Sequence, residues 1–245
     1  WSMDKVQSEA WMERRADGMR LDTPALTRYP NGGSETGSLA VYTGLERRWN
    51  RWKIEAAARY TRGWLESRFD AQPGLALPFQ QVSYNRGALT GSGTLHWTPR
   101  QRTGIHAVLS TAFRSPDVDD VGKVRAKDGF AIVPSDQLKP ERLAGLEMGG
   151  FWRSRNGQVK ADVSGFYTRL MDAIVPVDTV LFGANGEAVE TIVVEGDTSL
   201  IQVNANIGRA AISGSQWRLY FWPESGWRFK ATANFTRGVD MEKGG

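Results

Sequence analysis

The chain has 245 residues, of which 24% are charged, a formal net charge of +4 and no cysteine. The missing cysteines exclude a disulfide framework and thiol chemistry, and no apolar run reaches the roughly 18 residues of a transmembrane helix. The 31 Lys and Arg residues are scattered and form no basic block with interleaved aromatics, which argues against a nucleic-acid partner.

Along the chain, apolar and polar residues alternate in eight stretches with the two-residue period of β-strands. The clearest stretches are residues 52–60, 89–97, 105–114, 159–168 and 227–236. In each of them one face is mainly apolar and the other is polar, and Ile54, Leu95 and Val163 lie on the apolar faces. A strand of this kind suits a wall with lipid on one side and water on the other.

The connections between these stretches are alternately short and long. The short ones comprise residues 47–51, 98–104, 153–157 and 223–226, and the long ones comprise residues 63–83, 115–142 and 171–199. Long structureless loops are uncommon in compact soluble domains, whereas an outer-membrane barrel has short periplasmic turns and long extracellular loops. The sequence therefore predicts an all-β fold, with about eight to ten antiparallel up-and-down transmembrane strands that form a partial barrel.

Tryptophan placement supports the same fold. Six of the ten tryptophans lie beside the short turns, namely Trp49, Trp52, Trp97, Trp152, Trp222 and Trp227. Indole rings favour the interface between lipid and water, so this grouping predicts a periplasmic aromatic girdle. The alternative is that these rings cap the core of a soluble protein, but that alternative does not explain why they gather at one kind of connection.

Two motifs frame the long segment 115–142. The sequence Phe113-Arg114-Ser115-Pro116 ends one strand stretch, and Leu138-Lys139-Pro140-Glu141 precedes the next. This pair resembles the Phe-Arg-x-Pro and Leu-x-Pro-Glu boxes of TonB-dependent outer-membrane receptors. Residues 146–149 and 165–174 fit the two strands that follow in that family, and residues 29–34 and 236–240 match as well. The run from Asp119 to Lys123 is most similar to receptors of Bacteroidetes-type bacteria.

The resemblance implies a barrel of roughly 22 strands in the outer membrane, closed by an N-terminal plug. Such receptors import a scarce nutrient, such as a ferric siderophore, haem, cobalamin or a glycan, with energy delivered by TonB. Residues 1–245 are then expected to be a section of the barrel domain, without the plug, the N-terminal motif that contacts TonB or the C-terminal strands. The implied partners are membrane lipid, the receptor's own plug, the TonB complex and a small-molecule or glycan ligand. The section's share of the function would be barrel wall and ligand-capturing extracellular loops.

Three residues invite a specific interpretation. Arg114 is predicted to order the loop that follows it, by hydrogen bonds to nearby carbonyls or to Asp117, rather than to contact a ligand. His96 and His106 lie on polar faces and flank residues 98–104, so they are expected nearly opposite each other across a hairpin. Spacing suggests no third ligand, so the sequence predicts no metal site there.

Other candidate sites are weaker. Asp117, Asp119 and Asp120 lack the spacing of a calcium loop and are interpreted as solvated acidic residues. Residues 181–186 are predicted to form a hairpin tip, with ligand contact left open. No Ser-His-Asp arrangement can be built, so no catalytic residue, cofactor or metal site is predicted and the chain is not expected to be an enzyme. Haem receptors of the family usually place a His between the two boxes, and residues 117–135 contain none, which disfavours haem.

Two other classes of protein stay open on the sequence alone. One is a soluble all-β binding module, such as a sandwich or a propeller, and the other is a complete small outer-membrane barrel with a structural role. The identity of a ligand is not predicted, because specificity depends on side chains that converge from distant loops and from the plug.

Overall fold

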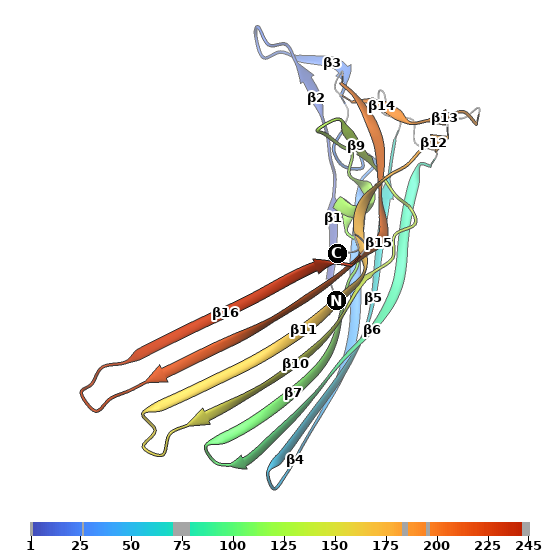
Figure 1. The fold of residues 1–245 in the computed structure, drawn as a ribbon. Coiled ribbons are helices and arrows are strands. Elements are labelled where there is room, and N and C mark those ends of the chain that lie inside the picture. Colours follow the sequence, from blue (N-terminus) through green and yellow to red (C-terminus); the bar gives the residue numbers. More distant parts are fainter. Residues whose placement is uncertain (1, 26, 71–78, 183–185, 195–196, 242–245) are drawn as a thin grey trace.

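The computed structural model describes residues 2–25, 27–70, 79–182, 186–194 and 197–241. Long β-strands dominate the described residues, and each pairs antiparallel with the next long strand along the chain. These long strands are β4 (Ser34–Trp49), β5 (Trp52–Arg68), β6 (Gln81–Arg100), β7 (Thr103–Arg114), β10 (Glu141–Arg153), β11 (Val159–Asp178), β15 (Asp197–Phe221) and β16 (Phe229–Asp240). The predicted up-and-down antiparallel fold is confirmed (Figure 1).

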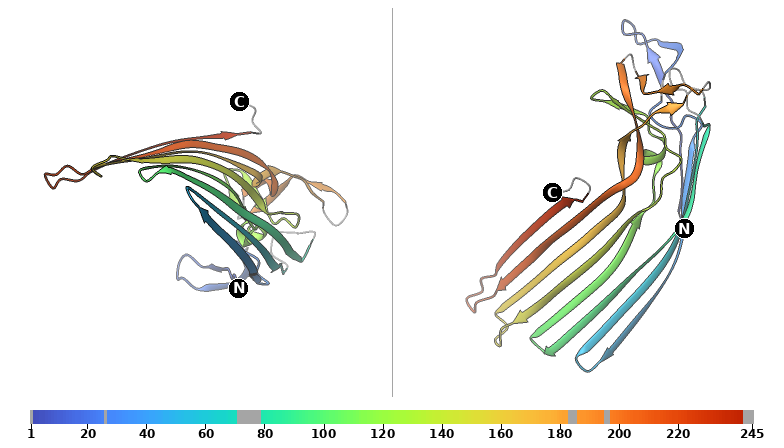
Figure 2. Two further views of the ribbon diagram at one scale, coloured as in Figure 1. Left: turned by 90° about the horizontal axis from the view of Figure 1, so that it is seen from below. Right: turned by 45° about the vertical axis from the view of Figure 1, so that its right-hand side comes forward.

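The long strands form one curved wall that stays open. Four short turns lie at one end of the wall, here called the turn end, and the long connections lie at the other, here called the loop end (Figure 1). The view along the wall shows an arc rather than a closed ring (Figure 2). Among the described residues, no helix is long and apolar enough to cross a membrane.

The smaller elements belong to the N-terminal segment and to the long connections. They are β1 (Ser2–Val6), β2 (Trp11–Glu13), β3 (Arg20–Pro24), α1 (Val118–Gly122), β8 (Arg125–Lys127), β9 (Phe130–Val133), β12 (Leu181–Phe182), β13 (Ala188–Val189) and β14 (Thr191–Val194). β1 pairs antiparallel with the edge of β4 that faces away from β5. β2 and β3 form a separate hairpin, and β9 pairs parallel with the loop-end part of β15.

The register confirms the two faces that the sequence predicts. Ile54 lies opposite Leu95, and Val163 lies opposite Trp217, so apolar side chains form continuous rows across the strands. The side chains of Ile54, Leu95 and Val163 are 39%, 40% and 40% exposed, so protein does not cover this apolar face. A soluble module would bury these residues, whereas a wall against lipid leaves them uncovered.

The first two short turns are tighter than the sequence predicts, whereas residues 154–158 between β10 and β11 match the predicted length and residues 222–228 between β15 and β16 exceed it. Residues 50–51 connect β4 to β5, and residues 101–102 connect β6 to β7, so the strands extend into the expected turns 47–51 and 98–104. Asn50 adopts the left-handed conformation, with a φ of 49°, which suits a two-residue hairpin turn. The expected tryptophan positions at the turn end are confirmed, and the rings of Trp52 and Trp97 stack with centroids 5.6 Å apart.

The long connections are shorter than the sequence predicts, because the strands continue beyond the alternating segments. The expected loop 63–83 is reduced because β5 runs to Arg68 and β6 starts at Gln81, and its residues 71–78 lie outside the described part. The expected loop 171–199 is reduced likewise, because β11 runs to Asp178 and β15 starts at Asp197. In the expected loop 115–142, only its last two residues belong to β10.

The hydrophobic core sits at the loop end, on the polar face of the wall. It consists of Leu65, Phe69, Val82, Tyr84 and Val121, with Phe79 and Val118 packed against it. The first four come from β5, β6 and the residue that follows β5, and Val121 comes from α1. The face of β5 and β6 that is polar toward the turn end thus becomes apolar at the loop end, where α1 covers it. This packing explains why the two strands extend past their predicted ends.

Candidate functional site

The connection between β7 and β10, residues 115–140, is folded against the polar face instead of projecting from the wall. A capping box starts its helix: the Asp117 carboxylate accepts a hydrogen bond from the Asp120 N–H, and the Asp120 carboxylate accepts one from the Asp117 N–H, both at 3.0 Å. The side chain of Val121 is then placed in the core. At Gly122, a Cβ would lie 2.7 Å from Cγ of Pro30, so the close approach of α1 to this proline requires glycine.

Arg114 joins the two motifs that frame this connection. Its Nη1 lies 2.6 Å from the Asp120 carboxylate, and its Nε lies 2.5 Å from the carboxylate of Glu141, its direct partner across the sheet. Asp117, the predicted carboxylate partner, is a weaker contact at 3.8 Å. The structural role predicted for Arg114 fits this geometry, but its side-chain hydrogen bonds go to Asp120 and Glu141, because the helix turns Asp120 back toward β7.

Two asparagines of β15 bind the same connection from the other side. Nδ2 of Asn204 donates to the Asp120 carbonyl at 2.8 Å. Asn206 accepts from the Lys139 N–H at 2.6 Å and donates to the Lys139 carbonyl at 2.8 Å. Asn206 also donates to the carbonyl of Asp172, whose φ of 56° marks the irregularity in the pairing of β11 with β15. The connection is therefore held to β15 by side chains as well as by strand pairing.

The connection spans most of the wall. At one side Val121 packs on the β5 and β6 side chains Leu65 and Val82, and at the other β9 pairs with residues 200–203 of β15, where Ile201 is 1% exposed. Glu141 adds a further link, because it accepts a hydrogen bond from the Ile174 N–H at 2.8 Å. Residues 115–140 thus connect strands of the polar face that are far apart in the sequence, and this segment is called the brace below.

A cavity of about 680 Å³ opens between this brace and the connection from β11 to β15. Its lining consists of Phe79, residues 134–139, residues 179–182 and residues 203–206. Asp136 and Lys139 are exposed there and form no ion pair within the described residues, while Phe182 is 66% exposed. The volume and the mixture of apolar and charged groups are those of a small-molecule site.

Two carboxylates of the brace have shifted pKa values. The ammonium of Lys123 lies 2.9 Å from Asp119 and lowers the pKa of that carboxyl. The pKa of Asp117 is raised, chiefly because burial disfavours its charged form, and the hydrogen bond from the Asp120 N–H opposes this shift only in part. The carboxylate of Asp117, which caps the helix, is therefore easier to protonate than that of an ordinary aspartate. Asp117 and Asp120 are engaged in the cap and with Arg114 rather than simply solvated, which corrects the expectation for this acidic run.

The two histidines lie where the sequence places them. His96 is the direct cross-strand partner of His106, and their ring centroids are 5.9 Å apart. Nε2 of His96 lies 3.1 Å from Glu55, and Nε2 of His106 lies 3.4 Å from Glu147, so each ring is oriented by its own carboxylate. In the part of the chain that the structure describes, no three His, Cys, Asp or Glu side chains converge as metal ligands.

The sequence motifs supplied only part of this site. Leu138 and Lys139 belong to the second motif, and the pairing of β12 with β13 confirms a hairpin around residues 181–186, of which 183–185 lie outside the described residues. Asn204, Asn206 and Phe79 were missed. Two asparagines two residues apart share one face of a strand, and this spacing was the one available signal for them.

Comparison with known proteins identifies the family. The family model "TonB dependent receptor-like, beta-barrel" matches residues 5–244, and the chain belongs to this family. Its members are outer-membrane proteins that act as transporters rather than enzymes, work with a plug and with TonB, and bind small ligands. Membership of this family replaces the two alternatives that the sequence leaves open, a soluble all-β module and a complete small barrel. The likeness to Bacteroidetes-type receptors stays a prediction. No curated protein matches the chain.

Solved structures show the same fold at low sequence identity. The copper transporter OprC matches with a TM-score of 0.69 and 15% identity, over 95% of this chain and 33% of that one. The Serratia marcescens hemophore receptor HasR, solved with its hemophore and heme, gives 0.65 and 15%, over 86% and 35%. The siderophore receptor PiuA from Acinetobacter baumannii gives 0.61 and 15%, over 84% and 26%. The chain therefore spans between about a quarter and about a third of the length of these proteins.

Proposed function

We propose that this chain forms barrel wall and ligand-capturing surface of a receptor for TonB-energised uptake of a scarce nutrient, a ferric siderophore or a similar compound. The observation that carries the proposal is the cavity of about 680 Å³ at the loop end, which in this family faces the outside of the cell. The plug, the TonB-contacting motif and the strands that complete the barrel belong, in this proposal, to other parts of the receptor.

The cavity suits a compact ligand with both aromatic and charged groups. Lys139 offers an ammonium to an anionic chelate, and Phe79 and Phe182 offer apolar surface in the lining of the same cavity. The brace positions these groups, because Asn206 holds the backbone of Lys139 from both its N–H and its carbonyl. Capture of this kind is binding alone, and no covalent step is involved.

Among the possible nutrients, haem is the least favoured. Residues 117–135 contain no histidine, and both histidines of the chain lie on β6 and β7 toward the turn end, far along those strands from Arg114. The structurally similar proteins include a copper transporter, an iron transporter, a siderophore receptor and a hemophore receptor solved with heme. These ligands belong to those proteins, and the nutrient of this chain is left to experiment.

Uptake by cells that carry the full-length receptor tests the proposal. A panel of ⁵⁵Fe-loaded catecholate, hydroxamate and mixed siderophores is offered under iron limitation to cells with the wild type, Lys139→Gln or Phe182→Ala. We expect one class to be taken up in a TonB-dependent manner, with both variants reducing its initial rate at limiting concentration by about tenfold. Lys127→Gln is the matched control, because this exposed lysine lies in β8 of the same brace and outside the cavity. Equal uptake by wild type and both variants contradicts a role for the cavity.

A further inference from the structure

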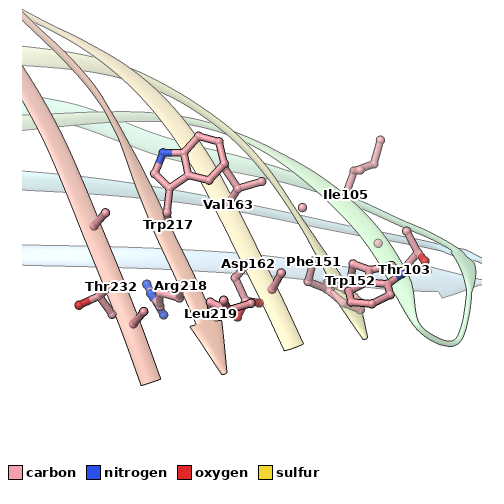
Figure 3. Close-up of a pocket in the computed structure, with 15 residues that line it drawn as sticks. Thr103, Ile105, Phe151, Trp152, Asp162, Val163, Trp217, Arg218, Leu219 and Thr232 are labelled. Atoms are coloured by element: carbon pink, nitrogen blue, oxygen red, sulfur yellow. The ribbon is translucent and has the colours of Figure 1, made fainter. Parts of the chain in front are cut away.

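The pair His96 and His106 lies on the polar face of the wall, toward the turn end. Ile105, the neighbour of His106 on β7, lines an apolar hollow of about 530 Å³ together with Val163 and Trp217 of the same row (Figure 3). Because side chains alternate along a strand, His106 points to the other side of the wall. The side chains of His96 and His106 are 39% and 28% exposed there, so water and ions can reach both rings.

The carboxylate beside each ring determines which nitrogen carries the proton. Nε2 of His96 lies 3.1 Å from Glu55, and Nε2 of His106 lies 3.4 Å from Glu147. An ionised carboxylate only accepts hydrogen bonds, so each neutral ring has its proton on Nε2 and its lone pair on Nδ1. Neither Nδ1 forms a hydrogen bond with a residue that the structure describes. Metal-binding histidines have this arrangement, in which one ring nitrogen donates to a carboxylate and the other binds the ion.

The two rings are close enough to share one ion. A metal that lies about 2.0–2.1 Å from one nitrogen of each imidazole holds the ring centroids roughly 5–6.5 Å apart. The separation of the His96 and His106 centroids is 5.9 Å, and direct cross-strand pairing sets it. Gly149 leaves room for the ring of His106, because a Cβ there would lie 2.6 Å from its Cε1. An ion can therefore join β6 to β7 without any shift of the strands.

The charges next to the pair tolerate a divalent cation. Lys53, the partner of His96 on β5, is already paired with Glu55 at 2.7 Å and with Glu46 at 3.2 Å. Glu147 forms no ion pair with a lysine or arginine among the described residues, so its negative charge is left to offset the charge of an ion.

A cationic hollow of about 720 Å³ borders the pair at the first two turns. His96 lines it together with Arg48, Arg51, Lys53 and Arg100. These cations disfavour a bare dication but attract anions, and a metal held by two histidines has coordination positions left for water or an anion. The hollow therefore suits a metal ion that carries a small anionic ligand.

We propose that His96 and His106 bind one divalent transition-metal ion through their Nδ1 atoms. Glu55 and Glu147 orient the two rings, and water or a small anion completes the coordination. Imidazole ligands suit Cu²⁺, Zn²⁺ and Ni²⁺, with Cu²⁺ bound most tightly, whereas Ca²⁺ and Mg²⁺ require oxygen ligands. Such a site needs only two side chains, so it is compatible with the lack of three convergent ligands in the described residues. The site lies away from the loop-end cavity and does not depend on which nutrient the receptor imports.

Copper binding to the full-length receptor tests this site. The protein is purified in detergent without a histidine tag, freed of metal with a chelator and titrated with Cu²⁺, and bound copper is followed by electron paramagnetic resonance. We expect one equivalent whose spectrum shows nitrogen coupling from two imidazoles. His96→Gln and His106→Gln should each remove this equivalent. The double variant should remove no more than either single variant, because both rings bind the same ion.

The two carboxylates are tested separately. Glu55→Gln and Glu147→Gln should each weaken copper binding by about tenfold, because a neutral amide orients a ring less firmly than a carboxylate does. Glu46→Gln is the matched control and should retain full affinity, since this carboxylate pairs with Lys53 and Arg48 and contacts neither histidine.

A chemical measurement replaces the variants if either histidine variant fails to assemble. Zn²⁺ added to the wild type should protect both His96 and His106 from modification by diethyl pyrocarbonate, and an equal concentration of Ca²⁺ should not.

Three results overturn the proposal. They are the lack of a copper equivalent that both histidine variants lose, the loss of two equivalents in the double variant against one in each single variant, and equal modification of both histidines with Zn²⁺, with Ca²⁺ and without metal. The second result assigns each histidine to an ion of its own.

Discussion

Arg114 is the residue whose removal should most clearly release the brace of residues 115–140 from the wall. Its guanidinium binds the carboxylate of Asp120 in α1 and that of Glu141 at the start of β10. Arg114→Ala leaves both carboxylates without this cation, although their side chains are only 15% and 13% exposed. The capping box and the position of α1 should both weaken, because Asp120 belongs to each of them.

The size of the effect follows from burial. Breaking a well-buried ion pair costs about 3–5 kcal/mol, because it leaves an uncompensated charge. Arg114 itself is 43% exposed, so water can reach the freed carboxylates, and we expect about 1–3 kcal/mol for local opening of the brace. At about 1.4 kcal/mol for each factor of ten, amides protected by the brace should exchange roughly 5- to 150-fold faster.

Hydrogen exchange measured by mass spectrometry on the full-length receptor in detergent reports this opening. The informative amides are those of Ser135, which donates to the Val121 carbonyl, and Val124, which donates to the Arg28 carbonyl, both at 2.9 Å. Arg125→Ala is the control, since this exposed arginine lies in β8 of the same brace. Unchanged exchange in Arg114→Ala, or equal acceleration in both variants, would refute the role assigned to Arg114.

Three further changes test other parts of the structure. Tyr84→Phe should leave the thermal midpoint unchanged or slightly raised, because the buried hydroxyl has no hydrogen-bond partner among the described residues. Leu65→Ala in the same cluster should instead lower the unfolding free energy by about 2–5 kcal/mol. A marked loss in Tyr84→Phe would contradict this environment. Leu109→Lys should cost about 2–4 kcal/mol in urea titrations in lipid, and its neighbour Ser110→Lys on the polar face should cost little, so equal costs would contradict the assignment of faces. Asn206→Ala removes three hydrogen bonds and should speed exchange at residues 137–139 by about tenfold or more, and unchanged exchange there would argue against this anchor.

The faces of the strands could be predicted because lipid and water impose opposite demands on alternate residues. That alternation is local, so Ile54, Leu95 and Val163 revealed it without any knowledge of their neighbours. The ends of the strands could not be predicted in this way. β5 continues past Gly63 because Leu65 is covered by Val121, and the sequence gives no sign that residues so far apart pack together.

The same limit applies to the candidate site. The sequence predicts that Arg114 orders the following loop, and it offers nearby carbonyls or Asp117 as partners because these groups are near in sequence. The actual partners depend on one turn of helix, which returns Asp120, and on the antiparallel register, which places Glu141 opposite Arg114. Asn206 belongs to a distant strand, and its role depends on contacts that local sequence patterns do not encode.

A cross-linking measurement tests most directly the central claim that residues 115–140 fold against the inner wall. A Cβ at Gly63 would lie 3.3 Å from Oγ of Ser115, and the chain has no cysteine of its own. The account predicts that the double variant Gly63→Cys, Ser115→Cys forms a disulfide in the full-length receptor in outer membranes under mild oxidation. Ser34→Cys with Ser67→Cys is the positive control, because these hydroxyl oxygens are 2.9 Å apart on paired strands. Free thiols at 63 and 115, under conditions that cross-link the control pair, would contradict the account.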